Sequence, residues 1–272
     1  MFRLDGKVAV VIGGMGYLGK QFCRALLEYG ASVYCCDVQA NLSQEDERFF
    51  HGVRSNLHPV TLDAAKQADL HRLAKEIQDE HGRVDILVNT TTMKGNDFYL
   101  PFEEVSLEGW EMGLLGNLTI PFLAIQAFIP YMKGRGSGSI INIASHYGLV
   151  GNDQRIYEGS NLHELYVKES PQITRVYAHG VYNAAKGGLI NFTRYLAAYY
   201  GEHNIRVNTI SPGGIYYERE NAEFLKRYSE KVPLGRKAKV DEVNGALVFL
   251  ASDASSYVTG HNLVVDGGYT CW

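Results

Sequence analysis

The sequence contains no long apolar run, no excess of one charge and few cysteines. Its 272 residues include 26 Lys and Arg against 30 Asp and Glu, which gives a net charge of −4. This balance argues against nucleic acid or an anionic membrane as a partner. The longer apolar segments are interrupted, and none approaches the roughly 20 residues that cross a bilayer. We therefore predict a compact globular protein with a small-molecule partner and no membrane partner.

The start of the chain and its cysteines are typical of a cytoplasmic protein. The first seven residues, MFRLDGK, are polar and lack the apolar core of a secretory signal. Cys23, Cys35, Cys36 and Cys271 show neither metal-ligand spacing nor a disulfide framework. The histidines are scattered, without an i, i+4 pair beside a third ligand. We expect free thiols in a reducing cytosol and no metal site.

Apolar, β-branched runs alternate with longer amphipathic segments along the chain. The first run, 7–12, is bounded by glycines and suits a strand that is buried on both faces. A helix-like stretch follows it to Tyr29. Similar runs recur at 32–37, 60–62, 84–89, 138–145, 205–211 and 262–266. This alternation predicts an α/β fold over a single domain, 1–272, in which a doubly wound parallel sheet has helices on both faces.

A glycine-rich turn follows the first predicted strand and opens the first predicted helix. Taken from Gly14, it reads G-x-G-x-x-G in the strand–turn–helix context that the motif requires. Glycines let the backbone approach a pyrophosphate, and the N–H groups at the helix start bind its charge. Asp37, at the end of the second strand, would accept the hydroxyls of an adenosine ribose and repel a 2′-phosphate. The pattern predicts a Rossmann-type site that prefers NAD. A turn that only packs helix on strand is the alternative.

Tyr182 and Lys186 share one face of a predicted helix, because positions i and i+4 lie one above the other. We expect the ammonium to lower the pKa of Tyr182 and make the phenol a general acid/base. Ser145 ends the strand at 138–145, on the sheet edge where such folds bind ligands. It is predicted to orient the substrate oxygen, with a helix cap as the alternative. Ser145, His146, Tyr147 and Tyr182 are predicted to contact the substrate.

On these residues, the chain resembles the compact single-domain branch of the short-chain dehydrogenase/reductase family over nearly its whole length. The resemblance implies an NAD-dependent oxidoreductase that interconverts a secondary alcohol and a ketone, with Ser145, Tyr182 and Lys186 as the catalytic triad. It adds Asn117, which would hold a water of the proton relay, and it implies a homodimer or homotetramer. The implied cofactor contacts are Gly13, Gly14, Gly16, Tyr17, Leu18, Gly19, Asp37, Leu62, Asp63, Asn89, Tyr182, Lys186, Pro212, Gly213 and Ile215.

The chain departs from the compact branch between Ser145 and Tyr182, where the family gap is much shorter. The extra residues, 152–180, are polar and mixed, with a short helix expected near 162–168. They must leave the sheet after the catalytic serine and return before the catalytic tyrosine, so we predict a substrate lid. Arg155, Lys168 or Arg175 would then meet an anionic group of the substrate. A subunit contact or surface flap is the alternative.

Two further departures refine the resemblance. The glycine spacing is one residue tighter than in the compact branch, and Thr90 and Thr91 replace two residues of its sheet element. The tight spacing, with segments 157–160 and 211–215, is similar to bacterial flagellin-modification oxidoreductases of surface-glycan biosynthesis, which implies a sugar or nucleotide sugar as substrate. Two alternatives stay open: a non-catalytic NAD-binding sensor or scaffold, and a nucleotide-sugar epimerase or dehydratase.

Overall fold

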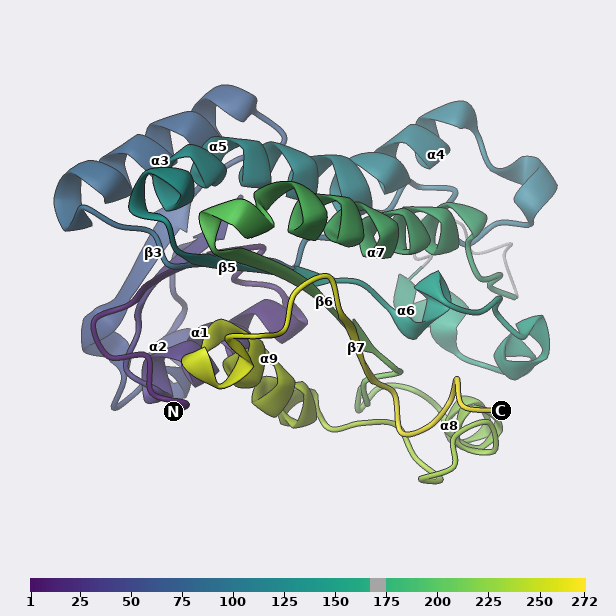
Figure 1. Ribbon diagram of the computed structural model, residues 1–272. Helices are drawn as coiled ribbons and strands as arrows, with labels where there is room; N and C mark the ends of the chain where they lie inside the picture. Colours follow the sequence, from purple (N-terminus) through teal and green to yellow (C-terminus); the bar gives the residue numbers. More distant parts are fainter. Residues whose placement is uncertain (167–174) are drawn as a thin grey trace.

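The computed structural model describes residues 1–166 and 175–272. Within these ranges, seven strands form one parallel sheet in the order β3-β2-β1-β4-β5-β6-β7 (Figure 1). They are β1 (Val8–Ile12), β2 (Ser32–Asp37), β3 (Leu57–Thr61), β4 (Ile86–Asn89), β5 (Gly138–Ile143), β6 (Ile205–Pro212) and β7 (Asn262–Val265). Every predicted run overlaps one of them. The predicted doubly wound α/β fold is confirmed.

Helices cover both faces of the sheet (Figure 1). One face holds α3 (Gln67–His81), α4 (Leu107–Leu114), α5 (Ile120–Arg135) and α7 (Gly180–Tyr200). The opposite face holds α1 (Tyr17–Glu28), α2 (Gln44–Phe49) and α9 (Asn244–Ala251). Two short helices, α6 (Leu162–Tyr166) and α8 (Ala222–Ser229), lie beyond the carboxyl ends of the central strands. The helix expected near 162–168 is present as α6 over Leu162–Tyr166, and residues 167 and 168 lie outside the described residues.

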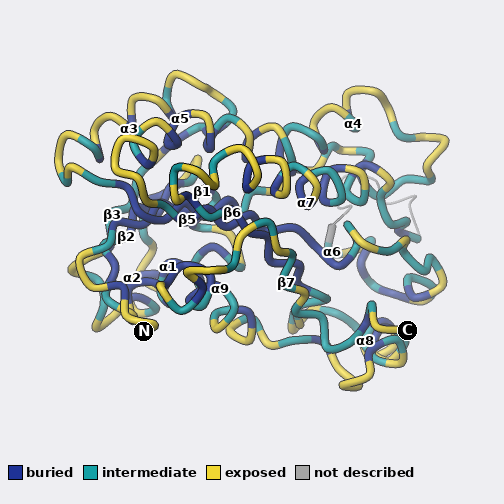
Figure 2. Tube along the Cα trace, viewed as in Figure 1, coloured by how far each residue is buried: buried dark blue, intermediate teal, exposed yellow. Residues whose placement is uncertain are grey.

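Two apolar cores fill the space between the sheet and its helices. All five residues of β1 are buried, and they alternate between the cores: Val10 packs with Phe128 of α5, and Val11 packs with Phe22 of α1. Figure 2 shows the strands as a buried layer between helices whose outer faces are exposed. Because Phe22 and Phe128 are fully buried, truncating either to alanine would cost about 3–5 kcal/mol.

One helix is longer and more apolar than the sequence led us to expect. A π-helical turn, Leu115–Thr119, joins α4 to α5, and neither Pro121 nor Pro130 ends the helix. The resulting span, Leu107–Arg135, is 29 residues long, and by length and composition alone it could cross a membrane. In the structure, however, 56% of its most apolar part is buried inside the protein. It packs on α3 and the sheet, as a core helix of this fold does.

Candidate active site

The predicted catalytic residues and the glycine turn line one cavity at the carboxyl ends of the central strands. Ser145, Tyr182 and Lys186 lie on its wall, and its volume is about 280 Å³. The other lining residues are Gly16, Tyr17, Leu18, Gly19, Thr90, Thr91, Thr92, Ile143, Ala144, Pro212, Gly213 and Ile215. We call this space the catalytic cavity.

A second cavity, of about 340 Å³, adjoins the first. The two share Gly16 and residues 90–92 of the segment that follows β4. Its wall includes Asp37 and Asp63, and among the described lining residues there is no Lys or Arg. The two cavities thus adjoin, with Tyr182 on the wall of the first and the two carboxylates on the wall of the second. We call the second space the adenosine cavity.

The backbone of the glycine turn leaves no room for side chains at two of its positions. A Cβ atom at Gly14 would lie 2.6 Å from the Cys35 Sγ, and one at Gly19 would collide with the Gly13 carbonyl oxygen. Gly13 has φ +83°, which side chains rarely tolerate. Gly16 precedes α1 and supplies no side-chain cap, so the amide groups of the first turn can face an anion. The turn therefore fits a pyrophosphate.

Asp37 ties the end of β2 to this turn. Its carboxylate accepts the N–H of Met15 at 3.0 Å and that of Val38 at 2.8 Å. Each carboxylate oxygen can accept a further hydrogen bond, so these contacts hold the group in place and leave it able to bind a ribose hydroxyl. With Asp63 on the same wall, the local charge disfavours a 2′-phosphate.

Tyr182 and Lys186 share one face of α7, but the pKa of the tyrosine differs from the prediction. Lys186 is 3% exposed and donates to the Ile143 carbonyl oxygen at 2.8 Å, and burial lowers the pKa of its amine to about 7. Burial raises the pKa of Tyr182, and a hydrogen bond with Ser145 opposes that shift in part. Burial favours the neutral form of the amine, and the amine is already bonded to a carbonyl, so it stabilises a phenolate weakly and the expected lowering of the Tyr182 pKa is not found.

Ser145 fulfils the capping alternative and stays able to act on a ligand. Its Oγ accepts the N–H of Tyr147 at 3.1 Å and caps the short 3₁₀ turn His146–Gly148. A hydroxyl that accepts one hydrogen bond keeps its own O–H as a donor. Capping thus fixes the Oγ on the cavity wall, beside Tyr182.

Asn117 lies in the π-helical turn and has one unused polar atom. Its side chain is fully buried, and its Nδ2 donates to the Gly113 carbonyl at 2.9 Å and more weakly to that of Met93 at 3.4 Å. Its buried Oδ1 has no partner, which suits a bound water. Turns of this kind often occur at functional sites. The relay role stays a prediction that these contacts fit.

The segment after β4 places different residues at the cavities from those that we expected. Asn89 donates from its Nδ2 to the Asn142 Oδ1 at 2.9 Å and is not among the described lining residues. Its contact with the cofactor stays a prediction. Thr90 and Thr91, which the sequence analysis treated only as replacements in the sheet element of the family, line both cavities together with Thr92. Their position directly after a buried strand is the sequence feature that could have predicted this.

His146 and Tyr147 belong to an aromatic cluster beside Ser145, whose Oγ lies 3.5 Å from the His146 Nδ1. His146 is 3% exposed, its Nδ1 lies 3.1 Å from the Pro212 carbonyl oxygen, and its ring lies 3.9 Å from that of Tyr147. Neither residue is among the described residues that line the cavity. Burial lowers the pKa of His146 to about 4. The contacts do not support the expected substrate contact of these two residues. Sequence reasoning also missed Tyr228, which belongs to the same cluster.

The described parts of 152–180 pack on α8. Ile156 and Leu162 form a small apolar core with Phe224 and Tyr228 of that helix, and Asn161 hydrogen-bonds the backbone on both sides of Glu220. This core is separate from the two that flank the sheet. The role of the segment as a lid stays a prediction.

The arginines of this segment are paired within it. Arg155 forms an ion pair with Asp153 at 2.8 Å, and Arg175 forms one with Glu158 at 3.3 Å. Neither lines the catalytic cavity, so these contacts do not support their expected contact with an anionic substrate. Lys168 lies outside the described residues.

The described residues contain no group of three His, Cys, Asp or Glu side chains placed to hold a metal ion. Cys23, Cys35 and Cys36 are buried free thiols, and Cys271 is an exposed one. The side chains placed at the site offer hydroxyl, phenol, amine and amide groups.

Comparison with known proteins gives these groups a context. The chain matches the family described as short chain dehydrogenase over residues 7–160, and the one described as enoyl-(acyl carrier protein) reductase over residues 168–270. It is 34% identical over 276 residues to a D-threitol dehydrogenase from Mycolicibacterium smegmatis, covering 99% of this chain and 95% of the relative. It is also 34% identical over 292 residues to a ribulose-forming D-arabinitol 2-dehydrogenase from Candida tropicalis, covering 100% and 95%.

Similar solved structures include two enzymes with different cofactors. One is a short chain dehydrogenase from Leptospira borgpetersenii with bound NAD+ (30% identity, TM-score 0.83, covering 98% of this chain and 94% of that one). The other is a gluconate 5-dehydrogenase from Burkholderia cenocepacia in complex with NADP and tartrate (29% identity, TM-score 0.82, 100% and 98%). None of these four proteins supports the similarity to flagellin-modification enzymes. Because one family match spans more than half of the chain and the relatives match its whole length, the protein belongs to the short-chain dehydrogenase/reductase family of oxidoreductases.

Proposed function

We propose that the protein oxidises a secondary alcohol of a polyol to a ketone, with NAD+ as the hydride acceptor, and catalyses the reverse reduction. The observation that supports this most directly is the catalytic cavity, in which Ser145, Tyr182 and Lys186 face the glycine turn. A nicotinamide bound in this cavity would supply the acceptor for the hydride of the carbon that bears the hydroxyl. The residues of this chain have to position that hydroxyl and remove its proton.

The three side chains divide this work. Ser145 donates its O–H to the substrate oxygen and orients it, and Tyr182 exchanges the proton with the same oxygen. Because burial raises its pKa, Tyr182 is protonated at neutral pH and ready to donate in the reductive direction. In the oxidative direction its proton has to leave, and Lys186, with a pKa of about 7, can accept a proton near neutral pH. A water on the unpartnered Oδ1 of Asn117 would extend this route.

A neutral polyol fits the cavity better than a nucleotide sugar. Apart from Lys186, the described residues of its wall are uncharged and include three threonines, which suit hydroxyl groups. A nucleotide sugar would need cations for its phosphates, and Arg155 and Arg175 are already paired with carboxylates. The activities named for the threitol and arabinitol relatives agree with this choice. A role in surface-glycan biosynthesis therefore has no support in the site.

The preference for NAD is proposed on the charge of the adenosine cavity. Asp37 and Asp63 lie on its wall, and its described lining residues include no Lys or Arg that would pair with a 2′-phosphate. The NAD+ complex of the Leptospira enzyme and the NADP complex of the gluconate 5-dehydrogenase show that similar folds hold either dinucleotide. These wall residues, and not the fold, support the preference.

Absorbance of NADH with a panel of four- to six-carbon polyols and of sugar nucleotides tests the proposal. We expect turnover with polyols, and Tyr182→Phe to abolish it while NADH still binds. Turnover retained by Tyr182→Phe would refute the assignment. Binding of NADH without turnover of any substrate would favour the sensor or scaffold, and a tightly held cofactor without net NADH release would favour the epimerase or dehydratase.

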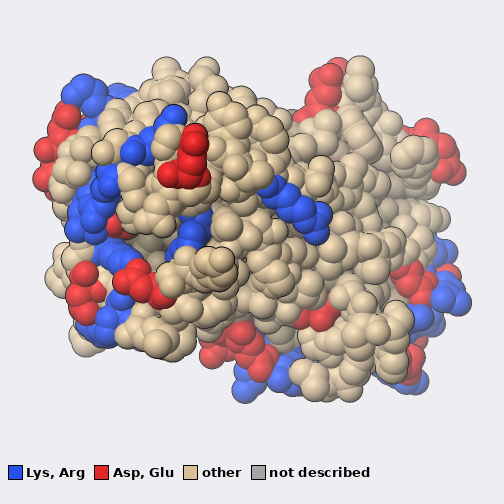
Figure 3. Space-filling view, viewed as in Figure 1, with Lys and Arg blue, Asp and Glu red and all other residues tan. Residues whose placement is uncertain are grey.

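A homodimer or homotetramer is part of the proposal. The face over α5 and α7 has few charged side chains (Figure 3). Phe122, Tyr195 and Tyr199 are exposed there by 43%, 59% and 57%, and such apolar patches mark association surfaces. Sedimentation velocity should give a dimer or tetramer for the wild type and monomer for Tyr195→Glu combined with Phe122→Lys. A monomeric wild type would contradict this.

A cytoplasmic location belongs to the same proposal. Three of the four cysteines are buried free thiols, which suits a reducing compartment. Cell fractionation with an antibody against the protein would test it, and recovery in an extracellular fraction would reject it.

A further inference from the structure

We propose that His146 and Tyr228 are positioning residues that hold the turn Pro212–Gly214 in place beside Ser145. The inference rests on the proposed function, because this turn and Ser145 line the same catalytic cavity. A turn on that wall would set where the reactive end of the cofactor lies relative to Tyr182.

A continuous line of hydrogen bonds joins the two ends of the turn through these side chains. The His146 Nδ1 lies 3.1 Å from the Pro212 carbonyl oxygen. A carbonyl can only accept, so Nδ1 holds the proton and Nε2 is left as an acceptor. The Tyr228 hydroxyl lies 3.4 Å from that Nε2 and accepts the N–H of Gly214 at 2.5 Å. The Tyr228 hydroxyl thus accepts from Gly214 and donates to the His146 Nε2, and the turn is braced at both ends.

The packing around this line leaves little room for the turn to move. His146 and Tyr228 are each 3% exposed. A Cβ atom at Gly214 would lie 2.5 Å from the Tyr228 ring, so the ring lies directly against the backbone of the turn. Buried hydrogen bonds in such surroundings are costly to lose, because the remaining partners are left without water.

The same tyrosine links the turn to the segment between the catalytic serine and tyrosine. Tyr228 lies on α8 and belongs to the apolar core in which Ile156 and Leu162 pack. His146 directly follows Ser145. The Tyr228 ring therefore takes part both in the docking of 152–166 on α8 and in the position of the turn. We infer that this segment contributes to the geometry of the reacting groups through α8, besides any contact with substrate.

Three variants separate a positioning role from ordinary packing. Tyr228→Phe keeps the ring and removes the hydroxyl that Gly214 and His146 share. His146→Leu removes both ring nitrogens, whereas His146→Asn restores a donor for the Pro212 carbonyl. Tyr269→Phe is the matched control, because Tyr269 belongs to the same core and its ring lies 5.4 Å from that of Tyr228, and no described hydrogen bond joins its hydroxyl to Gly214 or His146.

We expect Tyr228→Phe and His146→Leu to lower kcat about tenfold, since misplacing reacting groups by a fraction of an ångström slows hydride transfer. The deuterium isotope effect on kcat, measured with substrate labelled at the reacting carbon, should increase as kcat falls. The Kd of NADH should change less than about twofold. His146→Asn should recover part of kcat, and Tyr269→Phe should behave as the wild type.

Unchanged kcat and isotope effect in both Tyr228→Phe and His146→Leu would overturn the proposal, and so would an equal loss in Tyr269→Phe. If Tyr228→Phe does not fold, the comparison of His146→Asn with His146→Leu decides whether the hydrogen bond to the Pro212 carbonyl affects kcat. If the wild type oxidises no polyol, the proposed function fails, but this inference is still tested by the fluorescence lifetime of bound NADH. The lifetime should shorten in Tyr228→Phe, and an unchanged lifetime would reject the bracing role.

Discussion

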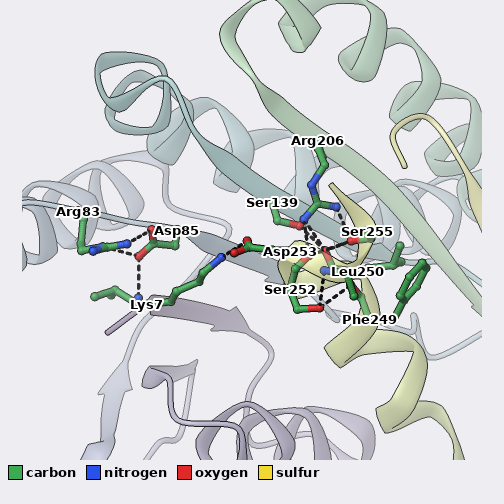
Figure 4. Close-up of polar contacts among 12 residues, drawn as sticks. Lys7, Arg83, Asp85, Ser139, Arg206, Phe249, Leu250, Ser252, Asp253 and Ser255 are labelled. Atoms are coloured by element: carbon green, nitrogen blue, oxygen red, sulfur yellow. Dashed lines mark hydrogen bonds and ion pairs between the residues drawn. The ribbon is translucent and has the colours of Figure 1, made fainter. Parts of the chain in front are cut away.

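The two edges of the sheet use polar groups in opposite ways. At the amino-terminal edge, charged and polar side chains pair with one another and with the ends of helices (Figure 4). Lys7 lies 2.6 Å from Asp253, and Arg206 donates to the carbonyl oxygens of Leu250 and Ser252 at the end of α9. At the carboxyl edge, Asn117 has a buried oxygen without a partner, and Lys186 is buried with a lowered pKa.

This difference separates stability from function. The contacts of Arg206 satisfy carbonyl groups that a helix end leaves free, so they stabilise the fold. The groups at the carboxyl edge are buried at a cost in free energy that their hydrogen bonds do not offset. Such groups persist where they act on a ligand. Substitutions at the carboxyl edge should therefore lower activity more than stability, and substitutions at the amino-terminal edge should lower stability more than activity.

Lys186→Met should cost the most activity and no stability. We expect kcat to fall by about 10²- to 10⁴-fold, the range for losing a group in proton transfer. The melting temperature should stay or rise, because the variant no longer buries an amine. Steady-state kinetics and calorimetry check this. A variant that loses stability in proportion to its activity would place Lys186 among the structural groups instead.

The pH dependence of the wild type sharpens this test. Burial lowers the pKa of Lys186 to about 7 from its ordinary 10.5. Between these values the unfolded chain binds a proton that the native protein does not, so this group makes stability rise with pH across that window. The rate of oxidation should also rise through pH 7 as the amine loses its proton. Both changes should be absent from Lys186→Met, compared by urea unfolding and by pH–rate profiles.

Arg206→Leu should show the reverse signature. It removes donors to Leu250, Ser252 and the Ser255 Oγ, and we expect a loss of about 2–4 kcal/mol in the free energy of unfolding. The kcat per folded molecule should not change, since Arg206 lies at the opposite edge from the cavity. Urea unfolding measures the free energy of unfolding, and kinetics combined with active-site titration with NADH gives kcat per folded molecule. A fall in kcat without loss of stability would contradict the division between the edges.

Asp37→Asn should change the ratio of the NADH and NADPH affinities by about tenfold. The amide keeps an acceptor for the Met15 N–H but removes the negative charge that repels a 2′-phosphate. We expect weaker NADH binding and tighter NADPH binding, measured by fluorescence titration. Asp63→Asn, on the same wall, is the comparison. If Asp37→Asn leaves the ratio of the two affinities unchanged, the preference for NAD has another origin.

The parts of this site that could be predicted from sequence are those with local causes. The run Val8–Ile12 and the glycines after it form a strand and a turn with little help from distant residues, and i, i+4 spacing places Tyr182 and Lys186 on one face. The partners of His146 are 66 and 82 positions away, so a pattern along the chain cannot reveal them. The pKa of Tyr182 was mispredicted for the same reason, because burial depends on the whole fold.

Tyr17→Phe, on the wall of the catalytic cavity, should give the smallest effect. Tyr17 begins α1, and its hydroxyl donates to the Tyr216 carbonyl oxygen at 2.8 Å, while its ring packs edge-on against Tyr217 at 5.9 Å. This contact joins the glycine turn to the chain that follows Pro212–Gly214, across the cavity that both line. Removing an exposed hydrogen bond is worth about 0.5–1.5 kcal/mol, so we expect NADH to dissociate about threefold faster.

Stopped-flow displacement of NADH measures that rate. Tyr216→Phe is the matched control, because the acceptor is the Tyr216 backbone and its side-chain hydroxyl takes no part in the contact. If release of NADH limits turnover, kcat of Tyr17→Phe should rise with the dissociation rate. Equal rates in the wild type and Tyr17→Phe would show that this contact does not retain the cofactor. The turn Pro212–Gly214 would then be held in place by the buried pair of His146 and Tyr228, and not by the exposed contact of Tyr17.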